Sequence, residues 1–464
     1  MDKSRLQLME TAPVKVAIIK LAIPTMVAMV VQFVYNLTDT FFIGQTGDAN
    51  MVAGISLAAP IFMLTQALGN VFAIGAASYI SRKLGEKDYA EAKHTSAVAI
   101  YTAIALSLVA MTVFFIFMRP LLGIIGTSAA TYAFTRDYLV IIAAFTPIPV
   151  LQVVLAGLVR SEGATRKAMN GMLIGIVTNI ILDPIFILDW GLGLGTAGAA
   201  WATVIGNVFG VIFFIQHFLS KKTLLSIKPK DFKPSGTIYA QTFKIGIPSA
   251  LSAMVMSVSF VLANVLASTY GDYVVAGNGV QMRVASLSFM MVMGLAQGYQ
   301  PFAGYCYGAR KYDRLNTGFK LTMLYSTLLS VTFMFIFLFF GKTLISLFID
   351  DPLTVEAGAR ILRAFTVCIP FFGLQVTILV TFQATGKAVK AMVISLGRQC
   401  LVYLPLLFLL NALYGFEGYI YAQPIADIVT TVIAFLLSLS FLKEMHAMHK
   451  KEIEPAIADV PQGI

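Results

Sequence analysis

The sequence is poor in the residue types from which soluble enzymes build their sites. Only 12% of its 464 residues are charged, where an ordinary soluble protein has about 25%. There are 3 cysteines and 4 histidines. Cys306, Cys368 and Cys400 lie in or at the ends of apolar segments, without the spacing of a disulfide framework or a metal cluster. The histidines also stand at segment ends, with no carboxylate or cysteine set expected around them. We therefore expect neither an enzyme nor a cofactor.

Long apolar runs take the place of such sites, and 58% of the residues are hydrophobic. The runs are about twenty residues long, enough for a helix to cross a ~30 Å hydrocarbon layer. The predicted fold class is all-α integral membrane, with twelve transmembrane helices. The first run follows a charged head and lacks a small-residue cleavage site, so we expect it to stay as a span. The expected spans are residues 16–44, 52–80, 95–118, 136–158, 168–188, 197–219, 242–268, 274–304, 317–340, 361–384, 390–412 and 418–441.

The basic residues are distributed unevenly between alternate loops, although the net charge is +10. Lysines and arginines gather in the N-terminus, in residues 82–93, 160–167, 221–244, 310–320 and 387–390, and in the C-terminal tail. The opposite loops carry few. By the positive-inside rule, both termini are predicted to be cytoplasmic in a multi-pass protein of the plasma membrane. The basic loops are thus interpreted as orientation signals and not as nucleic-acid contacts.

The two halves of the chain repeat at an offset of about 223 residues. Six spans per half would insert both halves in the same orientation, which predicts two six-helix lobes related by a pseudo-twofold axis along the membrane normal. We expect an N-terminal lobe (1–220), a surface linker on the cytoplasmic side (221–241), a C-terminal lobe (242–442) and a cytoplasmic tail (443–464), unstructured from Glu452. The matching segments are Lys20–Pro24 with Lys244–Pro248, Val52–Gly54 with Val275–Gly277, and Lys167–Met169 with Lys390–Met392.

Three acidic residues, Asp39, Asp183 and Asp427, are expected inside spans. An ionised side chain at mid-membrane costs about 2.5 kcal/mol or more, so each is a functional candidate that needs a partner or water. Asn179 stands four residues before Asp183 and shares its helix face. Pro184 follows and leaves a backbone carbonyl without its helical donor.

An oxygen-rich cation site in the N-terminal lobe is one interpretation of this pattern. Asp39 and Asp183 are both expected in the outward part of their spans, where they can meet. The two carboxylates would share a proton or, with Asn179 and Thr203, coordinate Na⁺. The alternative is that either acid only bonds neighbouring hydroxyls and fixes helix packing.

The second lobe has no such pair, since the repeat places Ala263 and Leu406 opposite the two acids. Asp427 is expected at a depth that allows an ion pair with Arg283 and Arg398. We interpret that pair as structural, with a part in ion relay as the alternative.

Glu162 ends another span, in Arg160-Ser161-Glu162-Gly163. Arginines lie on either side of it in the sequence. We interpret it as a surface ion pair or a helix cap and not as a catalytic acid.

Several motifs along the whole chain resemble the multidrug and toxic compound extrusion (MATE) family, and its DinF-type and MepA-like branch in particular. They are Leu21–Pro24 followed by Asp39 and Gly44, the Arg160–Gly163 turn, Gln297–Pro301 leading to Tyr307–Ala309, and the pair Ala202–Asn207 and Ala422–Asp427. Cys306 departs from the pattern, because the family often has Asn there.

The resemblance implies a MATE/MOP-type fold and a multidrug efflux antiporter that exports cationic amphiphiles in exchange for H⁺ or Na⁺. It transfers the coupling role to Asp39, Asn179, Asp183 and Thr203. The 35 Phe, 21 Met and 18 Tyr residues suit a cavity that binds flat cations of many shapes. We expect its lining to include Tyr35, Asn36, Gln66 and Met291, and we expect a monomer.

Other transporter classes remain as alternatives. A flippase for lipid-linked precursors would need several arginines in its cavity, and only Arg283 and Arg398 lie in spans. A major-facilitator transporter would carry an Asp-Arg pairing that the loop 81–91 lacks. A passive channel would not need two unequal lobes, and uphill flux would exclude it.

Overall fold

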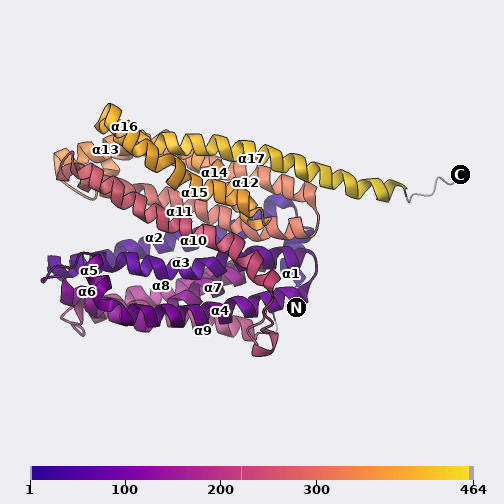
Figure 1. Cartoon of the computed structure of the whole chain (residues 1–464), viewed down its shortest axis with the longest axis horizontal. Helices are drawn as coiled ribbons and strands as arrows, with labels where there is room; N and C mark the ends of the chain where they lie inside the picture. Colours follow the sequence, from indigo (N-terminus) through magenta and orange to yellow (C-terminus); the bar gives the residue numbers. More distant parts are fainter. Residues whose placement is uncertain (1–2, 221, 459–464) are drawn as a thin grey trace. The chain divides into compact units, whose positions relative to one another are not determined.

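The computed structural model describes residues 3–220 and 222–458, and the side chains of 5–38, 41–220 and 222–450. Within these ranges the chain is helical and forms no strand (Figure 1). The first half holds α1 (Lys3–Glu10), α2 (Val14–Gly44), α3 (Ala49–Gly85), α4 (Tyr89–Ile116), α5 (Met118–Ile124), α6 (Tyr132–Ala144), α7 (Pro147–Ser161), α8 (Thr165–Ile187) and α9 (Gly195–Leu219). The second half holds η1 (Pro229–Asp231), α10 (Gly236–Ser268), α11 (Asp272–Gly308), α12 (Tyr312–Ser346), α13 (Pro352–Thr366), α14 (Ile369–Ala384), α15 (Ala388–Leu396), η2 (Gly397–Tyr403), α16 (Leu404–Tyr414) and α17 (Phe416–Ala458).

Two of the expected spans are each broken into a pair of helices. Ten helices in the described residues are long and apolar enough to cross a membrane, and the number reaches twelve if each bent pair is one span. The bends measure 55° between α6 and α7 and 54° between α13 and α14. Pro147 and Pro370 stand at the first turns of α7 and α14. A proline disfavours helical geometry in the residue before it, so each span breaks just ahead of its proline.

The chain forms two compact units, and most of their boundaries fall inside helices. Unit 1 comprises Met1–Leu6, Ile23–Ile80 and Tyr89–Ser257, and unit 2 comprises Gln7–Ala22, Ser81–Asp88 and Val258–Ile464. Helices α1, α2, α3 and α10 therefore contribute to both units. In α2 the change of unit falls just before Pro24, which removes one helical hydrogen bond.

Within unit 1, α8 packs along α9, and α7 lies against α4 and α9 (Figure 1). The linker after α9 packs on this unit through its buried residues 224–226, while residues 228–230 and 232–237 are exposed. Ser226 is buried and its amide donates to Ser96 Oγ at 3.0 Å. Tyr101 Oη donates to the carbonyl of Ile227 at 2.8 Å. The hydroxyls of α4 thus satisfy the linker backbone.

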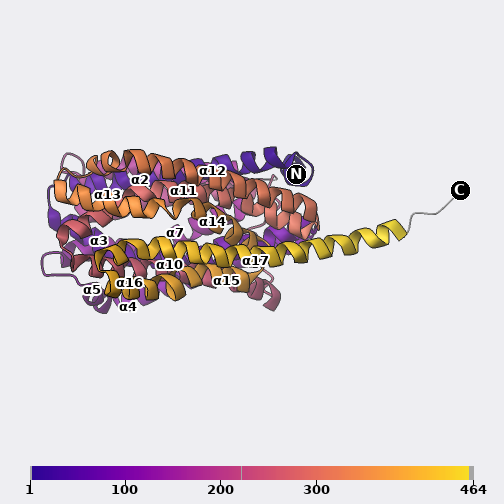
Figure 2. The ribbon, with the colours of Figure 1, turned by 90° about the horizontal axis from the view of Figure 1, so that it is seen from above.

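Within unit 2, α12 packs against α11 and α14, and α17 packs against α14 and α16. Figure 2 shows α17 running on past the ends of its neighbours α12 and α14. The tail prediction was wrong in part, because the segment from Glu452 continues α17 as far as Ala458. Residues 459–464 lie outside the described part of the chain.

Candidate functional site

A single face of α8 carries glycines on one half and polar side chains on the other. Gly171, Gly175, Asn179 and Asp183 follow one another at intervals of four and are all buried. Residues at this spacing lie above one another on a helix. Asn179 is 3% exposed and Asp183 is 0% exposed, so the predicted face points into the protein.

Helix α9 approaches this face closely because both helices carry glycine at the crossing. A Cβ on Gly206 would lie 2.5 Å from the carbonyl oxygen of Gly175. Small residues allow two backbones in a membrane to come within such distances. Thr203, one turn away on α9, is consequently brought beside Asn179.

The three described side chains of the candidate site form one hydrogen-bonded group. Asn179 Nδ2 donates to Asp183 Oδ1 at 3.3 Å and to Thr203 Oγ1 at 3.4 Å. Asn179 Oδ1 is buried, and no described residue donates to it. A carboxylate, an amide oxygen and a hydroxyl are hard oxygen donors of the kind that an alkali cation or a proton requires.

Asp39 lies in α2, but its side chain is outside the described part of the structure. Its participation stays a prediction. All four predicted cavity residues are described. Tyr35, Asn36 and Gln66 belong to unit 1, whereas Met291 belongs to unit 2 and packs against its apolar core. Their role as cavity lining also stays a prediction.

In unit 2 the acid Asp427 is held by a guanidinium. Arg398 Nε donates to Asp427 Oδ1 at 2.6 Å and Nη2 donates to Oδ2 at 3.1 Å. Gln423 Nε2 adds a third bond to Oδ1 at 2.8 Å. Arg398 projects from the π-helical turn η2, a kind of bulge that often marks functional positions. Arg283, predicted as a partner, is exposed and has no ion pair among the described residues.

Glu162 is buried, which contradicts the expected surface position. It is 1% exposed and caps the end of α7. Its Oε1 accepts from Arg5 Nη1 at 3.1 Å and lies 2.8 Å from His217 Nε2. Its Oε2 accepts from the Thr223 hydroxyl and the Leu224 amide, each at 2.9 Å. One carboxylate therefore ties α1, α7, α9 and the linker together.

Two of the histidines each have a single carboxylate partner at 2.8 Å. His217 lies against Glu162, and His449 Nε2 lies 2.8 Å from Asp313 Oδ2. Sequence spacing could not reveal either pair, because the partners are far apart along the chain. Among the described residues no group of three or more His, Cys, Asp or Glu side chains is placed to hold a metal ion.

Comparison with known proteins places these features in a family. A model of the MatE family matches residues 24–185 and again 248–409, in agreement with the internal repeat. The multidrug export protein MepA of Staphylococcus aureus (strain MRSA252) is 32% identical over 437 residues, 94% of this chain and 96% of that protein. MepA of Staphylococcus haemolyticus is 32% identical over 440 residues, 95% of this chain and 96% of that protein.

Solved structures agree with the sequence relatives. The outward-facing conformation of a multidrug resistance MATE family transporter of the MOP superfamily superposes with a TM-score of 0.89 at 25% identity, covering 95% of this chain and 98% of that one. A MATE structure in complex with MaL6 superposes with a TM-score of 0.90 at 25% identity, covering 95% and 99%. The predicted fold class is thereby confirmed.

Proposed function

The chain belongs to the MATE family, and on that basis we propose that it is an antiporter that exports cationic amphiphilic compounds in exchange for H⁺ or Na⁺. It is a multi-pass membrane protein and a multidrug efflux transporter, not an enzyme. The finer parts of the proposal are the coupling ion, the substrate class and the residues that carry them.

The observation that supports ion coupling is the buried group of Asn179, Asp183 and Thr203. A carboxylate with an exposure of 0% is costly to keep charged in apolar surroundings, even where it accepts a hydrogen bond as Asp183 does from Asn179. A bound proton or Na⁺ would remove that cost. Asn179 Oδ1 offers an oxygen to which no described residue donates. With Asp39 added from α2, the site would supply two carboxylates.

Export would follow from competition between the ion and the drug. Ion binding at Asp39 and Asp183 would change the bend of α2, where Pro24 already weakens the helix, and would displace drug from the outward-facing cavity. Drug could load again from the cytoplasm only after the ion had left. Exchange of a monovalent drug for one cation moves no net charge. Exchange for two cations would gain ~2.3 kcal/mol per 100 mV, or roughly forty-fold in accumulation.

Orientation and assembly belong to the same proposal. The basic loops support cytoplasmic termini in the plasma membrane. We keep the division into an N-terminal lobe, a linker, a C-terminal lobe and a tail, with boundaries after residues 220, 241 and 442. We propose a monomer that needs no cofactor besides the coupling ion. Protease removal of terminal tags in intact cells would test the orientation, since cytoplasmic tags are protected.

The central experiment measures efflux of a fluorescent cationic dye from proteoliposomes under an imposed Na⁺ gradient and, separately, a pH gradient. The unaltered chain is compared with Asp183→Asn and with Asp189→Asn, the same substitution at an exposed position six residues on. We expect one gradient to drive efflux, Asp183→Asn to abolish the gradient dependence, and Asp189→Asn to leave it unchanged. If neither gradient drives dye movement in the unaltered chain, antiport is wrong and lipid-precursor flipping becomes the better hypothesis.

A further inference from the structure

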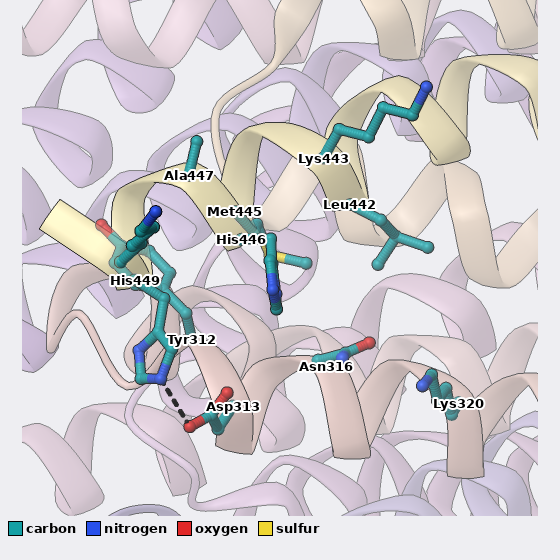
Figure 3. A pocket seen from close by; sticks show the side chains of 11 residues that line it. Tyr312, Asp313, Asn316, Lys320, Leu442, Lys443, Met445, His446, Ala447 and His449 are labelled. Atoms are coloured by element: carbon teal, nitrogen blue, oxygen red, sulfur yellow. Dashed lines mark ion pairs between the residues drawn. The ribbon is translucent and has the colours of Figure 1, made fainter. Parts of the chain in front are cut away.

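A cavity of about 600 Å³ lies in unit 2, between the first turns of α12 and residues 442–450 of α17, and it shares no residue with the candidate ion site. The first turns of α12 form one wall, with Tyr312, Asn316 and Lys320. Residues 442–450 of α17 form the other wall. Figure 3 shows His446 pointing from α17 toward α12, while Lys443 stands at the rim and extends away from α12. The transport proposal gives this cavity no role.

The charge of the lining is positive. Lys320, Lys443 and Lys450 line the cavity together with two histidines. Asp313 is the acidic residue of the lining, and it is held by His449 at 2.8 Å (Figure 3). A basic pocket at the membrane end of helices attracts anionic headgroups, and each nearby lysine strengthens binding about fivefold.

Two apolar stripes run from this cavity along the outside of the same helices. On α12, Leu324 and Leu328 follow Lys320 at intervals of four and are 51% and 55% exposed. On α17, Leu439 and Leu436 precede Lys443 and are 41% and 60% exposed. In a membrane protein, exposed leucines face acyl chains. A ligand with a charged head and apolar chains would therefore fill both the cavity and its approach.

Asn316 indicates that the lipid headgroup must carry a hydrogen-bond donor. Its Oδ1 is buried and no described residue donates to it, although a buried acceptor normally has a donor. A phosphate offers only acceptors to this atom. A hydroxyl on the headgroup would supply the missing donor while the phosphate contacts the lysines.

We propose that this cavity binds the headgroup of one anionic phospholipid that carries hydroxyls, such as a glycerol headgroup, with its acyl chains along the α12 and α17 stripes. The proposal depends on the membrane location of the chain and not on the identity of the coupling ion or drug. It makes the cavity a specific lipid site at the membrane surface that the proposed orientation assigns to the cytoplasm.

The test titrates the full chain in detergent with defined lipids and counts bound molecules by native mass spectrometry. Phosphatidylglycerol supplies charge and hydroxyls, phosphatidylethanol supplies the same charge without hydroxyls, and phosphatidylcholine is zwitterionic. We expect one site with a preference in that order. Lys320→Gln with Lys443→Gln should weaken the phosphatidylglycerol site about 25-fold, because two positive charges near the headgroup are lost. Lys230→Gln with Lys233→Gln, the same charge change in the linker, should leave it unaltered.

Asn316→Leu separates the two parts of the proposal. It should remove the preference for phosphatidylglycerol over phosphatidylethanol but keep the preference of both over phosphatidylcholine. Glycerol phosphate without acyl chains should not compete at millimolar concentration, because it cannot cover the leucines. Equal affinity for all three lipids, or an unchanged site in the double lysine variant, would overturn the proposal. Competition by glycerol phosphate as effective as that by lipid would also overturn it, in favour of a soluble phosphate ester.

Discussion

The candidate ion site can be tested by changing a residue without a side chain that could bind an ion. Gly206 lies where α8 and α9 cross, and its substitution by Ala adds one methyl group that would sit 2.5 Å from the carbonyl oxygen of Gly175. Ordinary van der Waals contact starts near 3.4 Å, so the helices would have to separate by about 0.9 Å. The nearest atom belongs to the backbone and cannot rotate away, and the next, Asn179 Cβ at 3.1 Å, is fixed to the backbone of α8.

This separation should weaken the ion site before it unfolds the protein. Asn179 Nδ2 and Thr203 Oγ1 are already 3.4 Å apart, at the outer limit of a hydrogen bond. A further ~0.9 Å breaks the contact and removes Thr203 from the ligand set. Loss of one such contact costs about 1 kcal/mol, which corresponds to roughly a fivefold rise in the ion concentration for half-maximal efflux.

The assay is dye efflux from proteoliposomes as a function of the driving ion, with thermal unfolding with and without that ion as a second readout. An ion that binds the folded state raises the midpoint of unfolding, and Gly206→Ala should reduce that increment. Gly279→Ala is the matched control, since its added Cβ meets nothing within 4 Å. An unchanged half-maximal ion concentration in a folded Gly206→Ala protein would refute the assignment of Thr203 and Asn179 to the site.

Three other perturbations follow from the buried charges and the helix caps. Glu162→Gln should lower the free energy of unfolding by about 3 kcal/mol in denaturant, because a buried charge pair loses one partner; a loss below 1 kcal/mol would contradict that. Arg398→Met should destabilise the protein strongly, and adding Asp427→Leu should restore part of the loss, since no buried charge is then left alone; no recovery would refute the pairing. The Thr354 hydroxyl and amide hold the pKa of Asp351 below its ordinary value. The contribution of the Asp351 carboxylate to the stability of the fold is therefore present above its unfolded pKa near 4. It is lost as pH falls through the lower pKa of the folded state. The difference in melting temperature between the unaltered chain and Asp351→Ala should shrink over that acid range, and a difference independent of pH would exclude the cap.

Local patterns in the sequence predicted the features that depend on residues close together in the chain. Apolar runs of span length predicted the helices, and the offset repeat predicted the two matched segments of the family model. The four-residue spacing of Asn179 and Asp183 predicted their shared face, which the structure places in the interior of unit 1. Periodicity suffices here because a helix fixes its own geometry.

The features that were missed depend on residues far apart in the chain. Glu162 looked like a surface residue because its neighbours in sequence are charged, yet its partners come from α1, α9 and the linker. The segments that contain Pro147 and Pro370 were each predicted as one unbroken span, but the structure bends both of them. The prolines occupy equivalent places in the two repeats. Proline positions alone could not predict the breaks, because Pro24 and Pro248 are equivalent in the same way and stand inside the continuous helices α2 and α10.

The contrast between the two units supports the proposal that ion coupling belongs to unit 1. The repeat places Ala263 and Leu406 opposite Asp39 and Asp183, and the structure puts both apolar residues in one hydrophobic cluster of unit 2. The acid that unit 2 does bury, Asp427, already receives two bonds from a guanidinium and one from an amide. A carboxylate so neutralised gains little from a proton or Na⁺. Under the proposed function, binding of the coupling ion would therefore stabilise one arrangement of unit 1 directly, whereas Asp427 in unit 2 already has its countercharge in Arg398.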